Sequence, residues 1–234
     1  MASFWKWFFL AFACGSVNTG GYFAAVRFVS HVTGFATLLG VGLGKGAWFD
    51  VFEVITVPLF FMLGCAISGW MVDGRIQRGL APRYAAPLLL ASALLVYAAL
   101  GGSSGWFGVF GEALDLKRDY FLLVSLCMSC GLQNAVVTMA SGTLMRASHA
   151  TGPATDISTG LVRAVLHPRG SLERRLETRL VAMRAACLGA FIAGAITGAW
   201  VYLRWQYLGF LLPAVIVLAV AGYIQLGELR RRPA

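Results

Sequence analysis

The stretch SHVTGFATLLGVGLG, residues 30–44, decides how this chain folds, because it is apolar but short. The 14 residues from His31 to Gly44 carry no acidic residue, Lys or Arg, whereas a bilayer-crossing helix needs about 20 residues. A close copy of its start, SHATG, stands at residues 148–152, and the match continues without a gap to Gly42-Leu43 and Gly160-Leu161. The copy predicts an internal duplication.

Composition sets the class of protein. The chain has 234 residues, of which 59% are hydrophobic and 12% charged, against about 25% charged residues in a soluble domain. Six long apolar runs contain no Asp, Glu, Lys or Arg, and each is close to or above the length of a transmembrane helix. These runs are residues 7–26, 54–72, 84–111, 120–145, 185–203 and 205–227. We therefore predict an all-α polytopic membrane protein.

The duplication extends beyond the opening motif. Gly15-x-x-Asn18 resembles Gly131-x-x-Asn134, and Leu63-Gly64-x-x-Ile67-x-Gly69 matches Leu188-Gly189-x-x-Ile192-x-Gly194. We predict one integral membrane domain made of two repeats, residues 1–111 and 112–234. Each repeat has three spans and one short segment that starts with His-x-Thr-Gly.

The distribution of Lys and Arg residues indicates whether the two short segments cross the membrane or re-enter it. If both dip into the membrane and return to the same side, one face receives 14 of the 19 Lys and Arg residues, and cytoplasmic loops carry such an excess. These 14 are Lys6, Arg75, Arg78, Arg83, Arg146, Arg163, Arg169, Arg174, Arg175, Arg179, Arg184, Arg230, Arg231 and Arg232. If both segments cross, the rule is broken. We predict about six transmembrane helices, two re-entrant or broken half-helices, inverted repeats and cytoplasmic termini in a bacterial inner membrane.

The repeated segment has the chemistry of a helix start. Thr33 and Thr151 are expected N-caps, and Pro153 suits a first helical turn. The free N–H groups of two half-helices near the midplane would attract an anion or a carbonyl group. Interrupted segments of inverted repeats commonly form the transport site. The candidate solute-binding residues are Asn18, His31, Thr33, Gly34, Thr37, Gln133, Asn134, His149, Thr151, Gly152, Thr155 and Asp156.

Several of these residues have two readings. Asn18 and Asn134 either bond the broken backbone or line a solute path. Gly34, Gly42, Gly152 and Gly160 also suit close helix packing, as Gly64, Gly69, Gly189 and Gly194 do. His31 and His149 are either hydrogen-bonded structural groups at helix ends or a proton relay or gate. Asp156 either pairs with an arginine or couples to a proton or cation. Arg146 and Arg163 are the nearby arginines, and Arg163 is on the same helical face.

Other features narrow the partners. The net charge of +9 is gathered at helix ends without interleaved aromatic residues, which favours anionic lipid headgroups over nucleic acid. Residues 167–180 read as a short amphipathic helix on the lipid surface. Cys127-x-x-Cys130 lies in an apolar run, where packing is the better reading than redox chemistry. No nucleophile–base pair, nucleotide loop or metal-ligand cluster appears, so we expect no enzyme, no cofactor and no metal.

The motifs resemble a known family. Asn18, the His31-x-Thr33-Gly34 segment, Gly-Leu-Gln133-Asn134 and Thr151-Gly152-x-x-Thr155-Asp156 are similar to those of YoaK-like bacterial integral membrane proteins, a domain of unknown function. The resemblance covers roughly residues 5–226. It implies a bacterial inner-membrane protein with about six spans and implies no substrate. Asn18 and Phe35 depart from the pattern, where the family often has Asp and usually has Asn, respectively.

Two functions fit this sequence. The first is a small-solute transporter or channel with a midplane site between the two half-helices. The second is a non-transporting subunit that packs against a larger membrane complex, or against copies of itself. A solute or ion, membrane lipids and a membrane-protein partner are the corresponding ligands.

Overall fold

The computed structural model describes residues 4–46, 48–112, 115–142, 145, 147–148 and 151–230. These residues form helices and loops, with no strand among them. The helices are α1 (Phe4–Ala25), α2 (Val32–Gly44), α3 (Trp48–Ile76), α4 (Ala85–Ser103), α5 (Leu116–Ala140), α6 (Thr151–Leu166), α7 (Leu172–Trp205) and α8 (Leu211–Arg230), with a 3-10 turn η1 (Gln206–Phe210) before α8.

The long helices coincide with the apolar runs. By length and composition, four helical stretches are able to cross a bilayer: Val54–Ile76, Ala85–Ser103, Lys117–Ala140 and Leu172–Arg230. The last of these runs through α7, η1 and α8. The 22-residue α1 is the remaining long helix. The all-helical, membrane-type architecture expected from composition is therefore confirmed.

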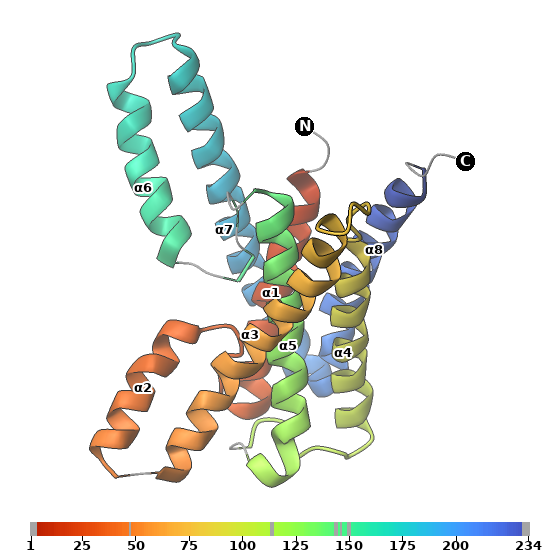
Figure 1. Ribbon diagram of the computed structural model, residues 1–234. Coiled ribbons are helices and arrows are strands. Elements are labelled where there is room, and N and C mark those ends of the chain that lie inside the picture. Colours follow the sequence, from red (N-terminus) through yellow and green to blue (C-terminus); the bar gives the residue numbers. More distant parts are fainter. Residues whose placement is uncertain are drawn as a thin grey trace.

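The body of the molecule is a bundle in which helices from the two halves cross each other. α1 packs along α7, α3 packs along α5, and α4 packs along α8 (Figure 1). α1 begins and α8 ends at the same end of this bundle (Figure 1). Buried Leu, Val, Ala and Cys side chains fill it, including Leu10, Leu88 and Leu126.

Glycines allow the crossing helices to approach closely. A Cβ on Gly15 of α1 would collide with the Phe191 carbonyl of α7, and one on Gly131 of α5 would collide with the Phe61 carbonyl of α3. Position 131 follows position 15 by 116, and position 191 follows position 61 by 130. The same contact is thus made twice, with α5 in the place of α1 and α3 in the place of α7.

A second pair of contacts fixes the same register. A Cβ on Gly64 would collide with the Met128 carbonyl, and one on Gly194 would collide with the Phe12 carbonyl. Gly194 follows Gly64 by 130, and Met128 follows Phe12 by 116. Gly64 therefore corresponds to Gly194 in space.

The predicted match of Leu63-Gly64 with Leu188-Gly189 is wrong in register by five residues. Apart from the glycine's own helix backbone, no atom of the described residues lies within 4 Å of a Cβ built on Gly69 or Gly189, so their predicted packing role against a neighbouring helix is also wrong there. Gly64 and Gly194 do pack closely, as expected. The alignment by sequence gives the wrong register because small residues recur along both helices. Only the glycines at the helix crossings meet a neighbouring backbone, and the sequence does not show where the helices cross.

Two helical hairpins project from one side of the bundle. α2 folds back on the first turns of α3, and α6 folds back on the first turns of α7 (Figure 1). Within the described residues, α2 packs against α3 alone and α6 against α7 alone. Figure 1 shows both helices starting at mid-height of the bundle and running toward opposite ends.

The predicted separate surface helix at 167–180 does not form. α7 is continuous over 34 residues, and its first turns belong to the α6–α7 hairpin. It starts at Ser171, whose hydroxyl accepts a hydrogen bond from the Arg174 N–H at 3.2 Å. Cap and helix propensity make one long helix here, because nothing between Leu172 and Trp205 interrupts it.

Candidate functional site

The candidate site is organised by two asparagines, one in each half. Asn18 lies on α1, seven residues before that helix ends at Ala25. Its Oδ1 accepts hydrogen bonds from the Ser30 N–H at 3.3 Å and from the Ser30 hydroxyl at 3.0 Å. The chain therefore turns back beside α1 after leaving it, and α2 starts at the depth of Asn18.

Asn134 does the same in the second half. It lies six residues before the end of α5, and its Oδ1 accepts from the backbone N–H groups of Ala147 at 3.1 Å and Ser148 at 3.4 Å. Ser30 and Ser148 are the first residues of the two copies of the repeated motif. Of the two readings of these asparagines, bonding to the broken backbone is thus confirmed.

At the start of α2, the expected cap is wrong. His31, not Thr33, occupies the N-cap position, and no side chain caps this helix end. Thr33 is the second residue of α2, because the backbone turns helical directly after His31. The exposed His31 ring lies edge-on to Phe28, 6.1 Å between ring centroids. Thr33 and Thr37 are exposed, and Gly34 is half-buried against the His31 ring.

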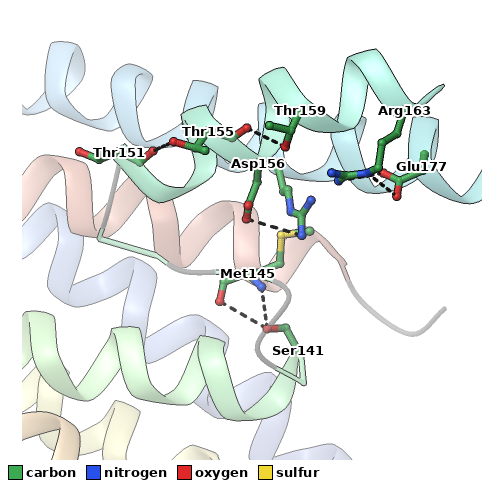
Figure 2. Close-up of polar contacts among 9 residues, drawn as sticks. Ser141, Met145, Thr151, Thr155, Asp156, Thr159, Arg163 and Glu177 are labelled. Carbon is green, nitrogen blue, oxygen red and sulfur yellow. Dashed lines mark hydrogen bonds and ion pairs between the residues drawn. The ribbon is translucent and has the colours of Figure 1, made fainter. Parts of the chain in front are cut away.

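At the start of α6, the hydroxyl groups are satisfied by the helix itself. Thr151 is the first residue of α6, so it stands inside the helix and not at the expected N-cap. The Thr155 hydroxyl donates to the Thr151 carbonyl at 3.1 Å, and the Thr159 hydroxyl donates to the Thr155 carbonyl at 3.0 Å (Figure 2). Pro153 lies in the first turn, as expected. Thr151, Gly152 and Thr155 are exposed, whereas His149 lies outside the described residues.

Two ion pairs join α6 to α7. Asp156 pairs with Arg184 at 3.6 Å, and Arg163 pairs with Glu177 at 3.0 Å (Figure 2). The Asp–Arg pair is confirmed but the partner is not Arg163, because α7 brings Arg184 alongside the first turns of α6. The Arg184 side chain is 13% exposed and the Asp156 side chain 54%. The buried Arg184 Nε has no hydrogen-bond partner among the described residues.

Gln133 lies elsewhere, fully buried in the centre of the bundle. Its Nε2 donates to the Ser129 carbonyl at 3.2 Å, and its Oε1 accepts from the Cys14 thiol at 3.6 Å. It therefore links α5 to α1 and does not join the exposed residues of α2 and α6. Cys127 and Cys130 are buried free thiols, which agrees with the packing reading.

The arrangement exposes two helix starts on one flank of the bundle. The starts carry backbone N–H groups, the hydroxyls of Thr33, Thr37, Thr151 and Thr155, and one half-exposed carboxylate, Asp156. α2 and α6 do not touch each other in the described part of the chain. In that part, no group of three or more His, Cys, Asp or Glu side chains is placed to hold a metal ion. Such a flank can solvate a small polar solute through hydroxyl and N–H groups.

Three residues that bond to the candidate site residues were not predicted from the sequence. Ser30 and Ser148 open the two copies of the repeated motif, and the structure adds that their backbone N–H groups donate to Asn18 and Asn134. Arg184 was missed as the partner of Asp156. The signal for Arg184 in the sequence is its position as the last charged residue before the apolar run 185–203.

Comparisons with known proteins identify a family and no close relative. A family model described as a protein of unknown function (DUF1275) matches residues 7–224. Searches of curated proteins and of solved structures found no match.

Proposed function

Because the chain belongs to the DUF1275 family, we propose its function from geometry: it is a small-solute transporter or channel whose site lies between the starts of α2 and α6. The resemblance to YoaK-like proteins is confirmed, since these form the same family. That family has no assigned function, and so the proposal stands on the residues of this chain.

The observation that carries the proposal is the asparagine pair. Asn18 and Asn134 each hold an interrupted backbone at a level inside the bundle, well before the end of their own helix. Non-helical backbone at membrane depth is tolerated where it is buried in protein or lines a water-filled cavity. The exposure of Thr33, Thr37, Thr151 and Thr155 favours the second case.

In our proposal, transport by this arrangement relies on an inverted repeat. We place the three long helices of each half across an inner membrane, with both termini cytoplasmic. The constant shifts of 116 and 130 residues between equivalent contacts support two superimposable halves. The opposite directions of α2 and α6 support an inversion (Figure 1). In such proteins one repeat rocks against the other around a fixed midplane site.

The chemistry of the site suits a small anion or a carbonyl-bearing solute. Helix starts present free N–H groups and positive dipole ends. The exposed hydroxyls of Thr33 and Thr37 add donors, whereas the Thr155 hydroxyl adds an acceptor, because its proton is donated within α6. Asp156 is half exposed beside Arg184 and offers a carboxylate for a proton or cation that accompanies the solute. We assign no catalytic role to these residues.

Water accessibility inside the membrane tests this proposal without knowledge of the solute. Thr37→Cys and Thr155→Cys are introduced singly, and the reconstituted protein is treated with a membrane-impermeant methanethiosulfonate. We expect both thiols to react, because the site is hydrated. Val215→Cys on α8 is the matched control, since Val215 is 62% exposed but lies on an apolar helix that faces lipid in our placement.

The result separates the alternatives. If Thr37→Cys and Thr155→Cys react with the methanethiosulfonate as little as Val215→Cys does, this flank faces lipid or protein. That result would contradict the proposed transport site. The unaltered chain, with its five native cysteines, sets the background.

A second candidate function is a membrane subunit, favoured by a groove on α7. Its lining is Ile196, Thr197, Trp200, Val201, Arg204 and Trp205. Both tryptophans are exposed in the isolated chain, as aromatic residues at protein–protein interfaces are before assembly. Mild extraction from native membranes, followed by mass measurement, tests it: a monomer with no co-purifying protein would count against a subunit.

A further inference from the structure

The α6–α7 hairpin extends past the end of the bundle. α6 starts level with Asn134, six residues or about 9 Å before the end of α5, and is about 24 Å long at 1.5 Å per residue. Its last turns therefore lie at most about 15 Å beyond the end of α5 along the bundle axis, and less because the hairpin leans outward (Figure 1). Figure 1 shows the hairpin projecting at the end where α1 begins and α8 ends, and leaning away from the bundle.

This projecting tip exposes large apolar side chains. On α6 they share one face at i, i+1, i+4 and i+5, and on α7 they stand one turn apart. We call them the tip strip: Leu161, Val162, Val165, Leu166, Leu172 and Leu176. Each is more than half exposed, and Leu166 reaches 77%. Apolar groups gathered in this way on a segment outside the bundle mark a contact with a membrane or a protein.

Positive charge surrounds the tip strip. Residues 160–181 hold five arginines and two glutamates, a net charge of +3. Glu177 pairs with Arg163. Arg169, Arg175 and Arg179 are exposed. Arg175 and Arg179 share the exposed face of α7 with Leu172 and Leu176, because these residues are spaced at i, i+3, i+4 and i+7. Apolar residues interleaved with cations are typical of a helix that sits in a lipid headgroup layer.

We propose that the tip strip and its arginines dock on anionic phospholipid headgroups of the leaflet from which the hairpin emerges. This rests on the membrane placement proposed above. The positive charge favours anionic headgroups over a second copy of the chain, because a second copy would bring another cationic tip against the first. Position also favours the headgroups, since the hairpin leans out over the same leaflet. Because the other end of α6 starts at Thr151, a docked tip holds α6 in place beside the candidate solute site.

A nitroxide at Leu166→Cys tests the docking in the full chain. The protein is placed in nanodiscs of phosphatidylcholine alone or of equal parts phosphatidylcholine and phosphatidylglycerol. Collision rates with oxygen and with a water-soluble nickel chelate report depth. We expect the label to be protected from nickel and open to oxygen in the anionic discs only. The unaltered chain treated with the same reagent sets the background.

Charge variants provide the matched comparison. Arg169→Gln, Arg175→Gln and Arg179→Gln together should lower the docked-to-free ratio on the order of a hundredfold, at about tenfold or less per arginine. Arg78→Gln, which removes one positive charge at the same end but outside the hairpin, should leave the label protected.

The outcomes are distinguishable from failure of the membrane placement. A label at Val215→Cys must read as lipid-embedded in both discs, and if it reads as water-exposed the placement itself is wrong. If Val215→Cys reads as embedded while Leu166→Cys stays open to nickel in the anionic discs, the docking is overturned. The tip strip would then need a protein to cover it.

Discussion

The two projecting hairpins share a backbone plan and differ in chemistry. The α2 hairpin is apolar on nearly all sides, with exposed Leu38, Val41 and Leu43. The α6 hairpin carries a ladder of threonine hydroxyls and two ion pairs to α7. Asp156 of α6 has Leu38 as its counterpart, and Arg184 has Val54, by the shifts of 118 and 130 residues.

This comparison distinguishes the contacts that both halves make from the charged contacts of the α6 hairpin. The glycine crossings and the asparagine bonds occur in both halves, so they form the common frame. The charges occur in the second hairpin alone among the described side chains of α2 and α6. We therefore expect variants of the frame to affect both halves alike, and variants of the charges to affect only the α6 hairpin.

The largest effect is expected at a helix crossing. Gly131→Leu places a side chain against the Phe61 carbonyl, where backbone atoms cannot yield, so the free energy of unfolding should fall by more than about 3 kcal/mol. Thermal stability in detergent, followed by size-exclusion chromatography, measures the loss. Gly15→Leu should be as severe, because Gly15 meets the Phe191 carbonyl in the same way. Gly189→Leu is the control, and an equal loss there would contradict the assigned register.

The next effect is expected at the asparagines. Asn134→Leu leaves the N–H groups of Ala147 and Ser148 without their acceptor and should cost about 2 kcal/mol. Asn18→Leu should cost less, about 1 kcal/mol, because Asn18 is only partly buried and one of its two donors is a hydroxyl that can turn elsewhere. The same stability assay compares them. Asn18→Leu proving the more harmful would show that the two breaks are not held alike.

A smaller effect is expected where the hairpins differ. Asp156→Leu gives α6 the residue of α2 and leaves the largely buried Arg184 without its carboxylate, which should cost about 1 kcal/mol after allowance for the exposure of Asp156. Adding Arg184→Val, which copies Val54, should restore most of this, since apolar pairs can replace an ion pair. Thermal stability of the single and double variants checks it. If the double variant is worse than the single, Arg184 has a role beyond the pair.

The smallest effect is expected at the exposed pair. Arg163→Gln or Glu177→Gln should change the free energy of unfolding by less than about 0.5 kcal/mol, because both partners keep contact with solvent. A double-mutant cycle in low and high salt measures the coupling. A coupling that persists in high salt would mean that the pair is shielded, as it would be under a lipid or protein cover.

Patterns along the chain are enough to predict the class of the fold and the places where its helices are interrupted. Apolar runs give long helices because backbone groups in lipid must be bonded within a helix. The His-x-Thr-Gly segments and their upstream asparagines appear as matched letters, and the structure joins them by hydrogen bonds to Asn18 and Asn134. These features are local, and therefore a single chain reveals them.

Tertiary structure decided the features that depend on distant neighbours. Gly64 pairs with Gly194 and not with Gly189, because only a helix crossing tells a packed glycine from an open one. Asp156 pairs with Arg184 and not with Arg163, because α7 folds back along α6. His31 and not Thr33 occupies the N-cap position of α2, because the hydrogen bond that the Ser30 N–H donates to Asn18 fixes where the chain turns. Contacts between residues far apart in the chain set these choices, and no local pattern encodes them.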